Sequence, residues 1–567
     1  MGFRELLSVQ TVHNARACVC SFPRARLQPS SPRILESPAM NVRRSLPLFL
    51  ASLVALAGGL LAQRKVELDK EFKDKNWGYA IRTIKGWNSM PADQDDRFTV
   101  GRWKLSLEDF EKRGDYDSLQ SGGFCELQIL RIQPKIETPT DGQKPADTSE
   151  RTPVPASLLA KLNVKNLEEW IEANYDGASK RWVRTPLKGG KMPGDMFEFG
   201  SRASHVTIGS FRHLGVEWAV VYTSFEENYR KTWRDTYIKS IQSFQVTANV
   251  NPEIADASRK DPAKLEGEEK RAALKASIDG KPGWFSIDTK YYVFLSNAER
   301  PFIEKLAKEL ETVREKVYVP NFKPRNQKVP LNPVRVFATA NEYYQFGGGR
   351  GSAGYFSPSK GELVLFQKFE DQSSERSKDD CRSVMFHEGF HQYVHFAIGD
   401  VSPHSWFNEG HGDYFAGLGV QGTVIGRTQV FDWRVDMLKQ HMREGKDLVP
   451  LRSLLRYSQS EYYSNAGLKY SQGWALIYYL REVCKDKNAR QALDTYFTYL
   501  ADNVTAFRAN RKEGDDGGTI PGTNVRLVNF ADEAKVNEIL SQAVDKAFAN
   551  VDLEALDKAL RSWIDGL

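Results

Sequence analysis

Residues 384–396 constrain the fold more than any other segment, because they place ionisable side chains in an otherwise apolar stretch. The sequence VMFHEGFHQYVHF leaves no clear polar face, which predicts a buried helix. His387 and His391 are four residues apart, so they lie on one face of that helix about one turn apart. Buried ionisable groups are costly unless they have partners, so another element of the chain must supply those partners.

The pattern H-E-x-x-H at His387, Glu388 and His391 is suited to binding a metal ion. Two imidazole nitrogens can converge on one ion while the intervening glutamate stands beside the open coordination position. A second predicted helix, with the sequence WFNEGHGDYF, offers Glu409 as a third ligand eighteen positions after His391. Asp413 lies one turn further along and can accept the outer N–H of a ligating histidine. Two histidines and one glutamate predict a single catalytic Zn²⁺ ion.

These residues resemble the gluzincin metallopeptidases, which include thermolysin and the aminopeptidase N type, and in particular the peptidase MA-like domains of exported bacterial proteins. The resemblance covers roughly residues 281–500. It implies that Glu388 is the general base and that Glu409 completes the zinc site. It also implies that Asn408 and Asp413, from the N-E-x-x-x-D stretch, orient the ligands without binding the metal themselves.

The same resemblance suggests how a substrate is held. Tyr470, in YSQGWA, is similar to the aminopeptidase tyrosine that donates a hydrogen bond to the tetrahedral oxyanion, although Trp474 follows the glycine where the family has a small residue. An edge strand before the zinc helix is expected to bind an extended peptide, with Gly354, Tyr355 and Phe356 as the candidates. No motif that grips a free amino terminus is recognisable, so endopeptidase and exopeptidase activity both stay open.

The rest of the chain predicts an α+β protein of two units joined by a polar linker. Residues 64–247 have mainly strand patterns, and GYAIRTIKGW with the closing tyrosine-rich helix loosely resembles the PsbP-like fold, a noncatalytic α/β sandwich. Residues 248–280 predict the linker with a solvated helix, and residues 281–567 the metallopeptidase-like unit. The predicted strands are 78–84, 125–132, 206–211, 217–223, 291–295, 334–337 and 362–366. The predicted helices are 167–175, 226–241, 299–317, 382–397, 408–419, 428–443, 470–485, 488–501 and 534–563.

The N-terminal sequence predicts export. Residues 40–62 have a short basic stretch, an apolar run and a small residue at the cleavage position, which is typical of a signal peptide. The run is shorter than the ~20 residues that span a bilayer, so no lasting anchor is expected and the protein is predicted to be periplasmic or extracellular. Residues 1–39 are interpreted as an annotation artefact before a start at Met40.

Charge and cysteine content exclude other classes. Most of the formal net charge of +6 comes from residues 1–44, so the remainder is nearly neutral and nucleic acid is not expected as a partner. The expected partner is instead a peptide or protein substrate. Cys125, Cys381 and Cys484 are widely spaced, so they allow at most one disulfide and are interpreted mainly as buried free thiols.

Other candidate residues fit their chemistry less well. A metal pair of His391 and His395 would lack a carboxylate at the base position. His404 is expected to be exposed in a loop. His411 is expected either at the surface or in contact with the substrate. Residues 349–354 match G-x-G-x-x-G, but no helix follows to hold a phosphate. The acidic cluster Glu513, Asp515 and Asp516 lacks the regular spacing of a calcium loop.

The sequence therefore predicts an exported zinc metallopeptidase in which zinc-activated water attacks a peptide bond. The alternative is a noncatalytic protein that binds a peptide or a polysaccharide through a peptidase-like domain. A zinc hydrolase acting on nonpeptide substrates is a third possibility.

Overall fold

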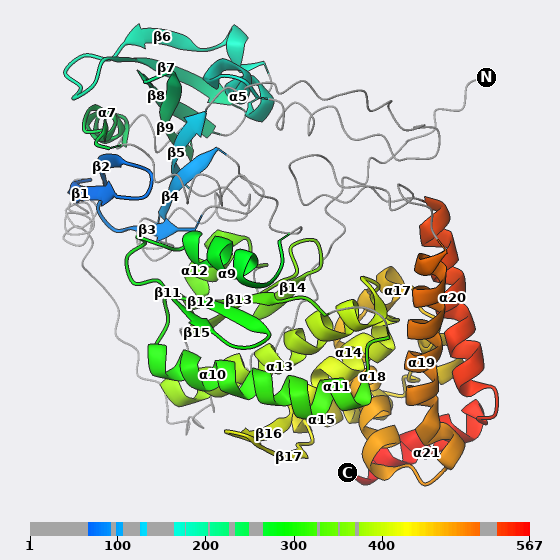
Figure 1. Ribbon diagram of the computed structural model, residues 1–567. Coiled ribbons are helices and arrows are strands. Elements are labelled where there is room, and N and C mark those ends of the chain that lie inside the picture. Colours follow the sequence, from blue (N-terminus) through cyan, green and yellow to red (C-terminus); the bar gives the residue numbers. More distant parts are fainter. Residues whose placement is uncertain are drawn as a thin grey trace, which may run out of the picture.

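The computed structural model has an α+β fold made of a sheet-rich N-terminal unit, residues 66–248, and a C-terminal unit, residues 265–567 (Figure 1). No helix in the described part of the chain is long and apolar enough to cross a membrane. The predictions for residues 1–39, for the signal peptide at 40–62 and for the acidic cluster at 513–516 lie outside the described residues. The structure describes residues 66–91, 98–105, 125–132, 164–175, 177–201, 204–225, 233–248, 265–325, 329–349, 352–368, 373–510 and 530–567.

An antiparallel seven-stranded sheet forms the centre of the N-terminal unit, in the order β3-β4-β5-β9-β8-β7-β6. The expected pair at 206–211 and 217–223 is confirmed as β8 and β9. The strands are β3 (Trp87–Met90), β4 (Thr99–Leu105), β5 (Glu126–Ile132), β6 (Val183–Pro186), β7 (Gly194–Ser201), β8 (Ser204–His213) and β9 (Val216–Phe225).

Alternating apolar residues give this sheet two buried faces. Helix α5 (Leu167–Asn174) covers one face, where Trp170 and Ile171 pack against strands β7 to β9. The opposite face packs against α7 (Arg234–Gln242) and a small sheet in the order β1-β2-β10. The small sheet consists of β1 (Leu68–Asp74), β2 (Tyr79–Ile84) and β10 (Gln245–Val246), and the short 3-10 helix η1 (Ala178–Lys180) follows α5.

The C-terminal unit begins with a five-stranded mixed sheet in the order β11-β12-β13-β15-β14, and α10 and α13 share a core with its apolar residues. Strand β14 lies at one edge and pairs antiparallel with β15. The elements of this part are α9 (Gly267–Ala276), β11 (Phe285–Asp288), β12 (Tyr292–Ser296), α10 (Arg300–Val313), the π-helical turn η4 (Arg314–Tyr318), α11 (Val319–Asn321), β13 (Asn332–Thr339), α12 (Ala340–Phe346), β14 (Gly354–Ser357) and β15 (Glu362–Lys368).

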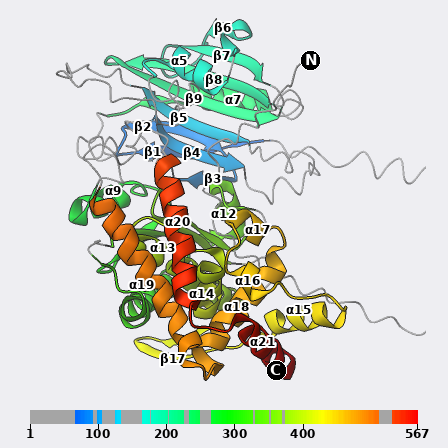
Figure 2. The same cartoon turned by 90° about the vertical axis from the view of Figure 1, so that its right-hand side faces the viewer.

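The remainder of the C-terminal unit is mostly helical, with α14 packed between α13 and α18 (Figure 2). Its elements are α13 (Ser374–Ile398), α14 (Ser405–Ala416), β16 (Leu418–Gln421), β17 (Val424–Thr428), α15 (Asp432–Arg443), α16 (Leu451–Leu454), α17 (Gln459–Tyr463), α18 (Ala466–Tyr478), the π-helical turn η5 (Tyr479–Val483), α19 (Lys487–Ala509), α20 (Phe530–Phe548) and α21 (Leu553–Gly566).

Three sequence-based expectations about these elements were wrong. The helix expected to end at residue 419 ends at Ala416 and the one expected to begin at 428 begins at Asp432, because residues 418–428 form a hairpin in which Gly422 adopts a left-handed turn conformation. The single helix expected at 534–563 is two helices, and Asp552 caps the second of them. The helix expected to be solvated in the linker buries Leu274, which packs with Ile278 against β12.

The cysteine interpretation is confirmed. Cys125, Cys381 and Cys484 are all buried and all free thiols. Burial strongly raises the pKa of the Cys381 thiol, which keeps it protonated and unreactive at neutral pH.

Candidate metal centre

Helices α13 and α14 bring the three expected ligands together. Nε2 of His387 lies 3.2 Å, and Nε2 of His391 3.3 Å, from the same Glu409 oxygen, Oε2. All three side chains are buried, with no more than 2% of any residue exposed. His387, His391 and Glu409 therefore form a buried group that could bind a metal ion.

Two glycines allow α14 to approach its neighbours closely. A Cβ atom on Gly412 would lie 2.8 Å from ring atoms of His387, and one on Gly410 would lie 2.7 Å from the main-chain oxygen of Gly473 in α18. Glycine normally weakens a helix by about 1 kcal/mol relative to alanine. Glycine is nevertheless required at position 412, because any side chain there would displace His387 from the group.

The outer nitrogens of the two histidines have acceptor partners. Nδ1 of His391 donates to Oδ1 of Asn408 at 2.9 Å, and Nδ1 of His387 lies 3.0 Å from Oδ1 of Asp413. Because a carboxylate or an amide oxygen can only accept, these contacts place the imidazole proton on Nδ1. The Nε2 lone pairs then both point toward Glu409, which is the arrangement that a metal ligand requires.

This donor set fits a cation at the centre of the group. Two nitrogen lone pairs facing one carboxylate oxygen at 3.2 and 3.3 Å would repel it unless a proton or a metal ion lay among them. Burial alone would raise the pKa of Glu409, but the adjacent histidines hold it well below its usual value. A negative carboxylate beside two imidazoles is therefore the favoured state of the site.

Arg434, on α15, extends this arrangement. Its guanidinium forms a buried ion pair with Oδ2 of Asp413, while Oδ1 of the same carboxylate faces His387. The Arg434 side chain also stacks over the ring of Trp433, at 4.0 Å from the centroid. The arginine compensates the buried charge of Asp413, so the chain Arg434, Asp413 and His387 holds the histidine in one orientation.

A tyrosine that the sequence analysis missed contacts the third ligand. The hydroxyl of Tyr463, at the end of α17, donates to Oε1 of Glu409 at 2.7 Å. This bond occupies one carboxylate oxygen and leaves Oε2, the atom near both histidines, for a metal ion. The sequence SEYYSN gives no metal-binding signal, so only the packing of α17 beside α14 shows this role.

Glu388 lies beside the metal group and is completely buried. Burial raises its pKa to about 7, although positive charge on the two histidines and the backbone N–H of Phe356 act in the opposite direction. Neither carboxylate oxygen makes a hydrogen bond of standard geometry with the described part of the chain. A carboxyl group with a pKa near neutrality is well suited to take up and return a proton.

Tyr470, the expected oxyanion donor, belongs to the same cluster of side chains. Its ring lies 5.8 Å from that of Tyr463, and the guanidinium of Arg434 lies 5.5 Å from its centroid. Tyr470 is buried, on the face of α18 that packs against α14. The structure therefore brings it next to two residues that contact the ligand group.

The expected substrate strand is β14, an edge strand beside α13. Gly354 has no room for a side chain, because a Cβ there would lie 2.6 Å from Val384 of α13. Tyr355 pairs with Val364 of β15, and the backbone N–H of Phe356 interacts with Glu388. The structure thus places the three residues named from the sequence at an edge next to the metal group.

Two histidine expectations were wrong. His411 is buried rather than exposed: Nδ1 contacts the main-chain oxygen of Phe407 at 2.9 Å and Nε2 accepts from Arg481 at 2.9 Å. His404 is only half-buried, but it bonds Tyr496 through both Nδ1 and its backbone N–H, and burial lowers its pKa to about 4. Both histidines are therefore structural.

His395 does not form the alternative metal pair. It is absent from the buried metal-binding group found among the described residues, and its ring packs 5.5 Å from that of Phe356. The G-x-G-x-x-G match at 349–354 lies partly outside the described residues, and the strand β14 begins at its end.

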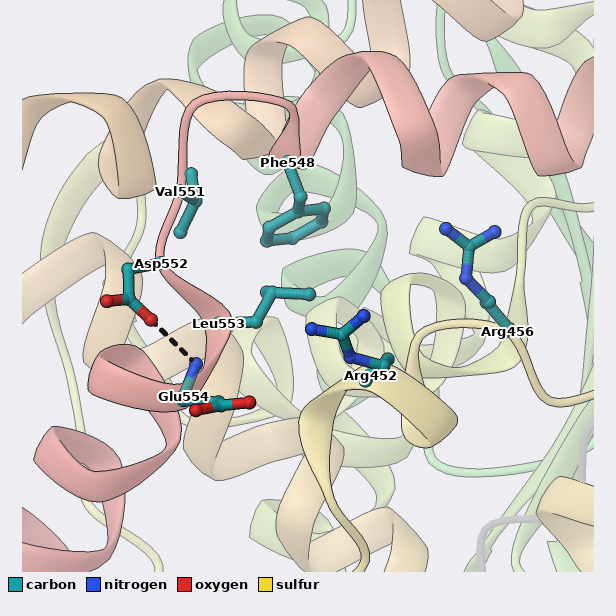
Figure 3. A pocket seen from close by; sticks show the side chains of 7 residues that line it. All are labelled: Arg452, Arg456, Phe548, Val551, Asp552, Leu553 and Glu554. Atoms are coloured by element: carbon teal, nitrogen blue, oxygen red, sulfur yellow. Dashed lines mark hydrogen bonds between the residues drawn. The ribbon is translucent and has the colours of Figure 1, made fainter.

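A surface pocket lies elsewhere, between α16 and the connection from α20 to α21, where Arg452, Phe548 and Leu553 point toward a common space (Figure 3). Two of its charged lining residues have partners within the protein, because Asp552 caps α21 and Arg456 pairs with Asp545. None of the metal group lines it.

Comparisons with known proteins give little further information. No protein-family model and no curated protein matches the chain. Among solved structures, the chain is similar to the solution structure of cyanobacterial PsbP (CyanoP) from Synechocystis sp. PCC 6803, with 10% identity and a TM-score of 0.20. The match covers 33% of this chain and 96% of that chain. The PsbP-like resemblance of the N-terminal part is thus a distant one that carries no functional argument, and the likeness to gluzincins rests on the motif residues.

Proposed function

We propose that the protein is a zinc-dependent metallohydrolase that cleaves peptide bonds. The observation that carries this proposal is the buried group of His387, His391 and Glu409 with the carboxyl group of Glu388 beside it. Two imidazoles and one carboxylate leave a fourth position open on a tetrahedral ion, as in catalytic zinc sites. A zinc ion held there would polarise a carbonyl group and lower the pKa of water toward ~7.

The side chains of this protein supply the remaining chemistry. Glu388 takes a proton from the attacking water and returns it to the leaving amine. Tyr470 donates a hydrogen bond to the oxygen of the carbonyl under attack, an effect commonly worth about 3 to 4 kcal/mol for a well-placed donor. Asp413 and Asn408 keep the Nδ1 protons of the two histidines in place.

Strand β14 binds the substrate in this proposal. A peptide added antiparallel or parallel to an exposed strand edge gains main-chain hydrogen bonds without a requirement for particular side chains. The packing of this strand against α13, the helix that carries Glu388, supports this role. An extended peptide or protein segment is therefore the proposed substrate.

The proposed location is periplasmic or extracellular, because residues 40–62 have the pattern of a signal peptide. Cleavage of this signal peptide would release the mature peptidase from the membrane. Detection of the processed N-terminus near Gln63 in secreted or periplasmic fractions would support this location.

One experiment separates the proposed activity from its alternatives. The purified protein is analysed for bound metals and then incubated with a mixed peptide library, with and without a chelator. We expect about one zinc per chain and cleavage that the chelator stops and added zinc restores, and the positions of the cuts distinguish internal from terminal cleavage. Zinc without cleavage would favour a noncatalytic binding protein, and cleavage only of ester or amide probes would indicate a nonpeptide hydrolase.

Tyr463→Phe should weaken metal binding without unfolding the protein. The substitution removes only the hydroxyl that donates to Oε1 of Glu409. Loss of such a supporting hydrogen bond typically lowers metal affinity by about 10-fold to 100-fold. Zinc dissociation constants measured by competition with a chromogenic chelator test this, with Tyr457→Phe as the matched control, because the Tyr457 ring contacts Lys469 instead of a metal ligand. Equal affinities for the two variants would contradict the role assigned to Tyr463.

A further inference from the structure

The N-terminal unit is joined to the C-terminal unit at the rim formed by β3 and β4, which meets helix α12 in both views (Figures 1 and 2). Gln345 of α12 is 1% exposed, and its Nε2 donates to the main-chain oxygen of Leu105 at 2.5 Å. Its Oε1 accepts from Asn88 at 3.4 Å, and its main-chain oxygen accepts from Lys104 at 2.7 Å. One buried glutamine is thus held by three residues of the other unit.

Apolar contacts reinforce this junction. Met90, the last residue of β3, is buried in the core of the C-terminal unit. Tyr344, next to Gln345, packs against the core of the N-terminal unit. The two cores therefore interlock at α12, so a movement of the β3 and β4 rim would be transmitted to this helix.

The other side of α12 is joined to the start of β14. The hydroxyl of Tyr343 and Oγ of Ser352 are 2.6 Å apart, and the Tyr343 ring lies 5.9 Å from that of Tyr355. The chain passes so close to this ring that a Cβ on Gly348 would lie 2.2 Å from it. Tyr343 is completely buried, so the lead into β14 is held against α12.

Strand β14 in turn lies against the helix that carries the metal ligands. Gly354 would place a Cβ 2.6 Å from Val384 of α13, and β14 as a whole packs against this helix. A continuous set of contacts therefore runs from the N-terminal unit through α12 to the edge of the sheet beside the metal group.

We propose that the N-terminal unit braces the substrate strand: through Gln345 and Tyr343 it holds β14 in place beside Glu388, and so sets the affinity for an extended peptide. The predicted effect on peptide affinity rests on the proposed peptidase function. The predicted effect on the conformational order of strand β14 does not depend on that function. Gln345 is a positioning residue in this scheme. A strand that is already ordered loses little backbone freedom when a peptide is added to it, so the brace favours binding.

The test compares Gln345→Ala with Asn76→Ala in the full chain. Asn76 also bonds across the two units, to Asp279 at 2.9 Å, but it is half-buried and its partner lies outside α12. Freeing roughly one backbone residue of β14 corresponds to about a tenfold rise in KM for extended peptides. We expect that rise for Gln345→Ala, with kcat and zinc content nearly unchanged, and no rise for Asn76→Ala.

Hydrogen exchange provides a second measurement that needs neither zinc nor activity. The amides of residues 354–357 should exchange faster in Gln345→Ala than in the parent protein, and at the parent rate in Asn76→Ala. If Gln345→Ala does not fold, Lys104→Met tests the same junction, because it removes the bond that Lys104 donates to the Gln345 main-chain oxygen.

The outcomes separate this proposal from the peptidase function. If the parent protein cleaves no peptide, the proposed function is wrong, and exchange at residues 354–357 still decides whether the brace exists. Unchanged protection in Gln345→Ala and Lys104→Met would overturn the brace. Equal changes in KM for Gln345→Ala and Asn76→Ala, or a parallel fall of kcat and zinc content, would also overturn it, because a general loss of structure would then explain the effect.

Discussion

Replacing Glu388 with glutamine should abolish peptide cleavage while the metal stays bound. The substitution keeps the size of the side chain but removes the group that accepts a proton, and general bases contribute about 100-fold to 10,000-fold to such reactions. None of the three ligand side chains is altered. Chelator-sensitive cleavage and zinc content, measured on the same preparation, test both halves of this prediction.

The stability of this variant provides its control. Burial raises the pKa of Glu388 to about 7, above its ordinary value. Ionisation of this carboxyl group therefore destabilises the folded protein, and the loss of stability increases as the pH rises above the pKa of the group in the unfolded chain. Glutamine removes that cost, so metal-free Glu388→Gln should melt at the same temperature as the parent protein or higher at pH 8. Glu444→Gln, at the exposed residue that follows α15, makes the same chemical change outside the site and should leave cleavage intact. Hydrolysis at the parental rate in Glu388→Gln would refute the assigned base.

The sequence predicted the metal group because its geometry is local. In a helix, a separation of four residues by itself places His387 and His391 on one face, whatever surrounds them. Glu409 and Asp413 are likewise related by one helical turn. A motif of this kind can be found without tertiary information, and the structure places all four side chains in one buried group.

The residues that support the ligands could not be predicted in this way. Arg434 and Tyr463 come from separate elements, α15 and α17, and each resembles an ordinary surface residue in its local pattern. The misplacement of His411 has the same origin, since its partner Arg481 is 70 residues away in the sequence. Interactions that depend on how helices pack leave no periodic signal in a single sequence.

The predicted boundaries of helices were wrong where the sequence contains local turn signals. The sequence VQGTV at 420–424 contains the glycine at the turn of the hairpin of β16 and β17. The helical patterns on both sides are much longer than this segment, so they dominate the prediction. Similarly, Asp552 is an N-cap residue inside a stretch that was interpreted as one continuous helix. Short turns between long helices are therefore the parts of this fold that hydrophobic periodicity alone does not show.

Replacing Glu409 with alanine should instead remove the metal. The loss of a supporting partner alone lowers metal affinity by about 10-fold to 100-fold, so the loss of one of three ligands should cost more than about 100-fold. Zinc content after dialysis against a weak chelator would then fall from about one ion per chain to nearly none. Cleavage should be lost together with the zinc, in contrast to Glu388→Gln.

Melting with and without zinc distinguishes this loss from misfolding. A ligand present at about 1,000 times its dissociation constant stabilises the folded state by about 4 kcal/mol, which raises the Tm of a unit of roughly 300 residues by about 6 °C. The parent protein should show that rise, whereas Glu409→Ala should melt cooperatively at one temperature in both conditions. The comparison is made within each protein, so it holds even if loss of the buried Glu409 side chain lowers the metal-free Tm of the variant. A variant that still binds one zinc per chain, with the full rise in Tm, would show that Glu409 is not a ligand.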